Sequence, residues 1–340
     1  MSRLRRLAPA LAVLVALLAV GVGVAVHQAR VRTATVSATI TRPAPELGPG
    51  AHLLLPGLDA APVVAPDRPH DPAEARQRPS PIGRRRTFSV TTNADGFRGP
   101  PLDTPPARPR VLCLGDSVTF GWGVEDDESW PARLATRHPE LEFVNAAVPA
   151  MKPDAIGAWA SRHAARLQPA LVFFTVRPNH AAGDAIGTYA HAVTAVARAV
   201  APARVAVILP PIGTFDPFGA REGPTEAPAL AARLPGVPLR DLTADFRAAL
   251  QRPGAPAGVL LQIDAGTQVV IGHPSGAERL RAAAPPRGLA PEIIALFEGD
   301  TSIAEPFFFD GGHPTAAGFA VFAEAVDAWA TSEGLWPAAR

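Results

Sequence analysis

The chain has 340 residues, 47% of them apolar, so it is long enough to bury a sizeable core in one large domain or two small ones. Its formal charge of +1 gives no overall attraction to nucleic acid or to acidic substrates. The single cysteine, Cys113, excludes an intrachain disulfide and a cysteine-ligated metal site, and its place in an apolar run predicts a buried core residue.

Residues 1–26 have the pattern of a membrane segment. Three arginines within the first six residues precede an uncharged stretch, Leu7–Val26, that is long enough to span a bilayer as a helix. The nearest small-x-small cleavage pattern, Val36–Ala38, lies well past this stretch, which favours an uncleaved anchor over a removed signal peptide. The basic N-terminus is expected in the cytoplasm. The sequence therefore predicts a single-pass, membrane-anchored protein with its catalytic part outside the cytoplasm, in the periplasm or at the cell surface.

Residues 27–86 are punctuated by prolines and show little helical or strand periodicity. This composition predicts a semi-extended spacer. Within it, His52–Val64 is rich in leucine and valine. Two outcomes stay open for that stretch: it belongs to the exposed spacer, or it packs onto the catalytic domain.

Residues 87–340 alternate apolar runs of strand length with helical patterns. The predicted strands are Arg110–Leu114, Leu141–Val144, Leu171–Val176, Val205–Leu209 and Val237–Leu242. The predicted helices are Ser129–Arg137, Asp154–Leu167, Ala185–Val200, Thr243–Leu250 and a last one with Phe319, Phe322, Val326 and Trp329 on one stripe. Such alternation predicts a parallel sheet covered by helices on both faces, a three-layer α/β/α fold. Residues 254–305 are less regular and could include a hairpin that forms a wall of the substrate pocket.

Two distant motifs supply a candidate catalytic triad. Ser117 follows the first predicted strand in the tripeptide Gly-Asp-Ser, and Asp310-Gly-Gly-His313 lies near the C-terminus. A serine hydroxyl becomes a good nucleophile when a histidine takes its proton and a carboxylate orients that histidine. The pattern therefore assigns Ser117 as nucleophile, His313 as base and Asp310 as orienting acid. Ser117 and Asn179 both follow strands, and ligand sites of open α/β sheets lie beyond the carboxyl ends of the strands.

No cofactor is expected. The sequence has no glycine-rich phosphate loop and no metal-ligand cluster of convincing spacing. A metal site of His180, His313 and Asp310 is an alternative, but the spacing suits a triad better.

These residues resemble the SGNH, or GDSL, hydrolases, a family of serine esterases with four short sequence blocks on a flavodoxin-like sheet; the resemblance is to the membrane-anchored bacterial type. It covers Thr87 to the C-terminus. Leu114–Val124 matches the first block and Asp310–Gly318 the last. The resemblance implies the same nucleophile, base and acid as the residues themselves, and it makes Asp116 structural.

The resemblance also implies three donors to the oxyanion: the backbone N–H groups of Ser117 and Ala150 and the side-chain amide of Asn179. Ala150 belongs to the second block, Asn145–Met151, where relatives often have glycines. Alanine keeps the N–H, so the donor is expected to survive if the backbone there avoids positive φ.

The third block reads Arg-Pro-Asn-His and departs from the family pattern at Arg177 and His180. The departure concerns the substrate class more than the reaction type. Arg177, His180 and Trp122 are therefore candidates for the substrate pocket. Upstream, Asn93 and Arg98 lie in a segment that resembles a strand and turn of membrane-anchored relatives, and both are expected to be structural.

The leading functional hypothesis is hydrolysis of O-acyl or O-acetyl esters on a cell-envelope glycan, a lipid or a small molecule. An O-acyltransferase with the same triad is the first alternative, since a glycan hydroxyl could replace water as the acceptor. A catalytically silent, glycan-binding relative is the second. The expected partners are thus an ester substrate and, through the N-terminal helix, the membrane, with no nucleic acid.

Overall fold

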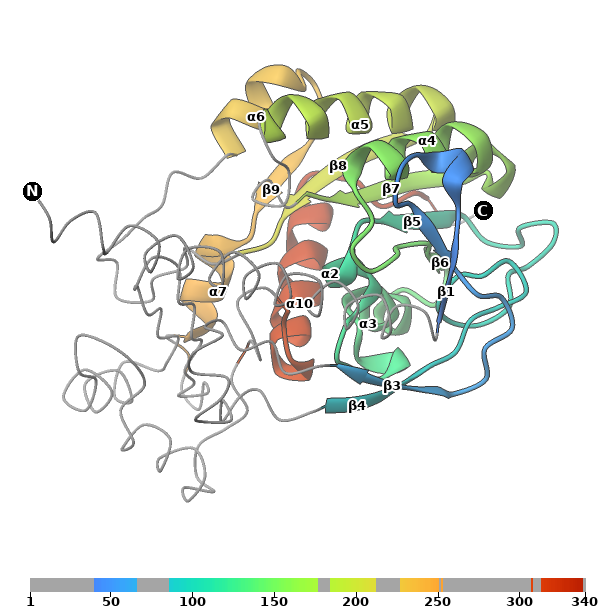
Figure 1. Cartoon of the computed structure of the whole chain (residues 1–340). Helices are drawn as coiled ribbons and strands as arrows, with labels where there is room; N and C mark the ends of the chain where they lie inside the picture. Colours follow the sequence, from blue (N-terminus) through green and yellow to red (C-terminus); the bar gives the residue numbers. More distant parts are fainter. Residues whose placement is uncertain are drawn as a thin grey trace, which may run out of the picture.

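The computed structural model of the chain describes residues 40–65, 86–176, 184–211, 227–250, 252, 307 and 313–338. Its centre is a sheet of five parallel strands in the order β6-β5-β7-β8-β9 (Figure 1). The strands are β5 (Arg110–Leu114), β6 (Glu142–Asn145), β7 (Pro169–Thr175), β8 (Arg204–Leu209) and β9 (Leu239–Asp241). The first strand of this sheet lies between the second and the third, which is the flavodoxin-like order. The predicted parallel sheet is confirmed.

Helices cover both faces of this sheet (Figure 1). One face carries α4 (Pro153–His163), its 3-10 extension η3 (Ala164–Leu167), α5 (Ala185–Val200) and α6 (Ala227–Arg233). The other carries α3 (Trp130–Arg137), α7 (Thr243–Leu250) and α10 (Ala316–Ser332). The three layers that the sequence predicts are therefore present, and α6 is a short helix that the sequence patterns did not indicate.

The core is divided by the sheet, as the alternation of strand side chains requires. All five residues of β5 are buried. Leu112 and Leu114 pack with α4 and α5, whereas Val111 and Cys113 pack with α3 and α10. The apolar stripe predicted for the last helix is also buried, with Phe319, Phe322 and Val326 at 0% exposure and Trp329 at 6%. Burial on both faces explains why Val111–Leu114 of β5 are an unbroken apolar run.

Residues 40–65 correct the prediction of a spacer over residues 27–86. They form β1 (Thr41–Pro43), the 3-10 turn η1 (Pro45–Leu47), β2 (His52–Leu54) and β3 (Ala61–Ala65). Strand β1 pairs with β2, and β3 pairs with β4 (Arg86–Val90), both antiparallel. Ile40, Leu47, Leu54 and Val63 are 0 to 4% exposed and join the core cluster of α4 and α5. Pro43 stands at the end of β1 and Pro45 at the start of η1, two places where a missing N–H is tolerated.

Other predicted segments lie outside the described residues: the N-terminal span, the rest of the spacer, residues 254–305, and Arg177, Asn179, His180 and Asp310. Among the residues that are described, no helix has the length and apolarity to cross a bilayer.

Candidate active site

The nucleophile candidate stands where the strand order of the sheet reverses. Strand β5 has β6 on one side and β7 on the other, and Ser117 begins the short helix α2 (Ser117–Phe120) three residues after Leu114, where β5 ends. Ligands of open α/β sheets bind at such a switch point, beyond the carboxyl ends of the strands. The fold thus places Ser117 where its neighbours can reach a substrate.

Close packing shapes the turn between β5 and α2. A Cβ atom on Gly115 would lie 2.3 Å from Thr119 Oγ1 and 3.2 Å from Thr175 Cβ, so only glycine fits there. The carboxylate of Asp116 accepts a hydrogen bond of 3.0 Å from the backbone N–H of Val118 and caps α2. This helix cap is the structural role that the resemblance implied for Asp116.

His313 meets Ser117 across 196 residues of sequence. Its Nε2 lies 2.8 Å from Ser117 Oγ, and both residues are buried, at 9 and 8% exposure. A histidine nitrogen at this distance can take the hydroxyl proton, which is the geometry of a base and its nucleophile. The pairing predicted from the two motifs is present.

The start of α10 holds His313 in place. Thr315 caps this helix, since its hydroxyl oxygen accepts a hydrogen bond of 3.2 Å from the N–H of Gly318. The N–H of Thr315 donates to the carbonyl of Phe307 at 2.9 Å. That carbonyl passes so near Gly318 that a Cβ there would lie 1.9 Å from it. Thr315 and Gly318, both part of the last sequence block, therefore fix the loop that presents the histidine.

Arg98 supports the loop on the other side of Ser117. Its guanidinium, 1% exposed, donates to the carbonyls of Phe120 (2.8 Å), Gly121 (2.7 Å) and Val124 (2.7 Å) and to Asp126 Oδ1 (2.7 Å). Burial lowers the pKa of Arg98, and the adjacent carboxylate of Asp126 opposes that shift. The helix that starts with Ser117 ends at these carbonyls, so Arg98 acts as its C-terminal cap and has the structural role expected of it.

Arg98→Lys should lower the free energy of unfolding by about 3 kcal/mol. An ammonium cannot replace a planar guanidinium that bonds four carbonyls, including that of Ser89 at 3.2 Å, and a carboxylate, and unsatisfied buried acceptors are costly. The control is Arg137→Lys, whose half-exposed pair with Asp327 (3.2 Å) should change stability by under about 1 kcal/mol. Urea unfolding measures both, and equal effects would contradict the assigned role of Arg98.

The second block adopts a backbone that the sequence did not lead us to expect. Ala150 has a φ of 61°, in the left-handed region, so the condition stated for this donor, a backbone that avoids positive φ, is not met. The N–H of Met151 donates to the carbonyl of Val148 at 3.1 Å, and Pro149 occupies the second position of this four-residue turn. Proline second and positive φ third are the marks of a type II turn, which normally has glycine in the third position.

Asn145, which ends β6, ties the second block to the nucleophile helix. Its amide nitrogen donates to the carbonyls of Thr119 (3.1 Å) and Phe120 (3.3 Å), and its side-chain oxygen accepts from the N–H of Ala147 at 3.3 Å. The backbone N–H of Arg98 donates to the carbonyl of Asn145 at 3.1 Å. The two blocks are thus one hydrogen-bonded unit beside Ser117.

Trp122 is the one pocket candidate among the described residues. Its ring is partly buried and packs edge-to-face on Phe88 of β4 at 5.3 Å, while the backbone N–H of Trp122 donates to the carbonyl of Ser117 at 2.9 Å. The other predicted site residues lie outside the described part of the chain and stay predictions: Arg177, Asn179, His180 and Asp310.

Sequence reasoning gave no role to His52, because a single histidine among prolines carries no signal, yet its ring contacts the second block through the carbonyl of Pro149.

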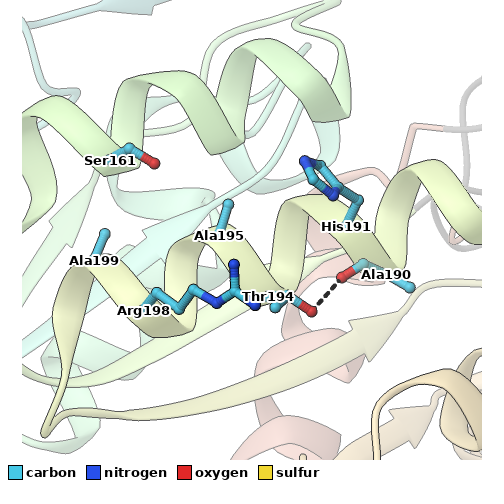
Figure 2. Close-up of a pocket in the computed structure, with 7 residues that line it drawn as sticks. All are labelled: Ser161, Ala190, His191, Thr194, Ala195, Arg198 and Ala199. Atoms are coloured by element: carbon cyan, nitrogen blue, oxygen red, sulfur yellow. Dashed lines mark hydrogen bonds between the residues drawn. The ribbon is translucent and has the colours of Figure 1, made fainter.

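A groove of about 520 Å³ lies away from these residues, on the solvent side of α4 and α5 (Figure 2). Figure 2 shows its lining: Ser161, Ala190, His191, Thr194, Ala195, Arg198 and Ala199. The hydroxyl of Thr194 donates to the carbonyl of Ala190 at 2.8 Å, so its hydrogen bond is made within α5. The groove contains neither Ser117 nor His313. Within the described ranges, no group of three histidine, cysteine, aspartate or glutamate side chains could hold a metal ion.

Comparison with known proteins finds likeness at the level of structure only. No protein-family model matches the sequence, and no curated protein does. Solved structures that are similar include a member of the lipolytic G-D-S-L family from Veillonella parvula DSM 2008, at 14% identity and a TM-score of 0.38, over 66% of this chain and 96% of that one. A catalytic mutant of an acetylxylan esterase from Geobacillus stearothermophilus has 14% identity and a TM-score of 0.36, over 65% of this chain and 93% of that one.

An α/β hydrolase from the metagenome of Lake Arreo, Spain, is similar at 16% identity and a TM-score of 0.35, over 68% of this chain and 97% of that one. All three TM-scores are too low for these proteins to carry a functional argument. The case for an active site rests on the buried pair of Ser117 and His313 at the switch point of the sheet.

Proposed function

We propose that this protein is a serine esterase that hydrolyses O-acyl esters through an acyl-enzyme intermediate on Ser117. The observation that carries the proposal is the 2.8 Å contact between Ser117 Oγ and His313 Nε2. Acyl transfer through a serine requires at least a nucleophile and a base within hydrogen-bond distance of each other.

The reaction follows from this geometry. His313, with its proton on Nδ1, accepts the hydroxyl proton of Ser117 at Nε2 while Oγ attacks the ester carbonyl. The imidazolium then gives that proton to the departing alcohol oxygen, which leaves the acyl group on Oγ. A water molecule, deprotonated by the same nitrogen, attacks the acyl-enzyme and releases the carboxylic acid and free Ser117.

Two further parts of the mechanism come from the family resemblance. Asp310 accepts the Nδ1 proton of His313 in a hydrogen bond and stabilises the imidazolium. The N–H groups of Ser117 and Ala150 and the amide of Asn179 bind the oxyanion of the tetrahedral intermediate. Three donors aimed at one developing charge would supply the largest electrostatic contribution to the rate.

The substrate class that we propose is an O-acyl, notably O-acetyl, ester of a cell-envelope glycan or lipid. The support is the predicted N-terminal span, which would hold the catalytic domain outside the cytoplasm, close to such esters. Arg177, His180 and Trp122 would line the pocket.

Labelling by a fluorophosphonate and turnover of p-nitrophenyl acetate test the proposal in the full-length chain. The wild type should show both and Ser117→Ala neither, because the probe and the substrate need the same oxygen nucleophile. Ser161→Ala is the matched control, since Ser161 lies in the outer groove of Figure 2 and its variant should still be labelled. Labelling of Ser117→Ala at the wild-type level would refute the proposal.

A second assay tests whether water or a glycan hydroxyl accepts the acyl group. The enzyme is given acetylated polysaccharide with and without an unacetylated acceptor glycan. Free acetate alone is the expected product. Acetyl groups that appear on the acceptor glycan would show that the enzyme is a transferase.

A further inference from the structure

His52 connects the N-terminal hairpin to the second sequence block. It opens β2 and pairs with Pro43 of β1, in a segment that packs into the core beside α4. Its Nε2 lies 2.6 Å from the carbonyl oxygen of Pro149, and its Nδ1 lies 3.3 Å from the carbonyl oxygen of Gly50. A carbonyl oxygen can only accept, and the contact with Pro149 is the shorter of the two, which assigns Nε2 as the donor to the carbonyl of Pro149.

The turn that His52 contacts lies directly beside the nucleophile loop. It comprises Val148–Met151, with Pro149 second and Ala150 third. The N–H of Val148 donates to the carbonyl of Gly115, two residues before Ser117, at 3.3 Å. The peptide unit between Pro149 and Ala150 therefore belongs to a turn that is hydrogen-bonded to the segment just before Ser117.

That peptide unit has two competing orientations. Type I and type II turns differ mainly by a rotation of the central peptide of roughly half a turn. Alanine in the third position favours type I, because left-handed φ brings its Cβ close to the backbone. The observed φ of 61° at Ala150 shows the type II orientation, against this preference. Some contact must hold it there, and the hydrogen bond from His52 is made to the carbonyl that would rotate away.

The orientation decides where the N–H of Ala150 points. In a trans peptide the C=O and N–H bonds point in opposite directions. When Pro149 C=O turns toward His52, the N–H of Ala150 is aimed away from His52, and a flip to type I would reverse it. A donor to an oxyanion works only in the aimed state.

We propose that His52 is a positioning residue for catalysis: it holds the Pro149–Ala150 peptide in the type II orientation so that the N–H of Ala150 can bind the oxyanion. This inference rests on the proposed esterase function. It also gives a catalytic purpose to the segment of residues 40–65, which brings His52 to the turn from 97 residues away. The alanine makes His52 necessary, because glycine would adopt the same turn without a steric penalty.

Two variants of similar size test the hydrogen bond in the full-length chain. His52→Leu removes the donor and should lower kcat for p-nitrophenyl acetate about tenfold with little change in KM, because the lost interaction is made in the transition state. His52→Gln keeps an N–H donor of similar reach and should recover most of that loss. Rates are divided by the number of sites that a fluorophosphonate labels, so misfolded chains do not count.

A double-mutant cycle separates positioning from a general effect on the fold. In an Ala150→Gly background, His52→Leu should cost under about threefold, because glycine holds the type II turn without help. An unchanged kcat in His52→Leu, or the same loss in both backgrounds, would overturn the role of His52. Full turnover in Ser117→Ala would refute the esterase proposal itself. An unchanged kcat in His52→Leu would refute only the role of His52, so the two failures can be told apart.

Discussion

Ser117→Ala and His313→Ala are each expected to lower kcat for p-nitrophenyl acetate by about 10⁴-fold or more, and the double variant should lose no more than either single one. The reason is the 2.8 Å contact between Oγ and Nε2. The hydroxyl without its base is a weak nucleophile, and the base without the hydroxyl has nothing to activate. Once one member is gone, removal of the other therefore changes nothing further.

Single-turnover kinetics on the two single variants and the double variant measure this directly. His138→Ala is a suitable histidine control, because that ring pairs with Asp327 at 2.8 Å and packs on Trp336, among the helices α3 and α10. Its kcat should stay within about twofold of the wild type. Losses of the two single variants that multiply in the double one would mean that Ser117 and His313 act independently, against the assigned mechanism.

Deletion of residues 1–85 is expected to prevent folding. It removes Ile40, Leu47, Leu54 and Val63, which are 0 to 4% exposed in the core beside α4 and α5. Burial of four such side chains contributes about 6–12 kcal/mol in total, which is comparable with the roughly 5–15 kcal/mol that stabilises a whole domain. The deletion also removes β3, the partner of β4 in their two-stranded sheet, and so leaves both edges of β4 unpaired among the described residues.

Deletion of residues 1–39 is the matched control, since it keeps Ile40 and every residue of β1, β2 and β3. This shorter deletion should give a cooperative urea transition and labelling of Ser117. The longer one should give neither a transition nor near-ultraviolet circular dichroism of packed aromatic rings. A stable, cooperatively unfolding chain that starts at Arg86 would show that residues 40–65 are dispensable.

The main sheet and its helices could be predicted because each leaves a local pattern in the sequence. Val111–Leu114 of β5 are a continuous apolar run since the strand is buried on both faces, and α10 shows its core stripe at helical spacing. Helix α5 begins and ends at the predicted residues for the same reason. The short α6 was not predicted, because seven residues give too few turns for a periodic pattern to show.

The sequence by itself determined the order of the strands along the chain and the candidates Ser117 and His313, because Ser117 follows a buried apolar strand and His313 stands in an Asp-x-x-His motif. Only the tertiary structure decided that a proline-rich segment belongs to the core, that Arg98 caps the helix of Ser117, and that Ala150 takes a left-handed φ beside His52. These features depend on contacts between residues far apart in the chain. Local composition and periodicity carry no record of such contacts, because a buried partner is supplied by the fold and not by the neighbouring residues.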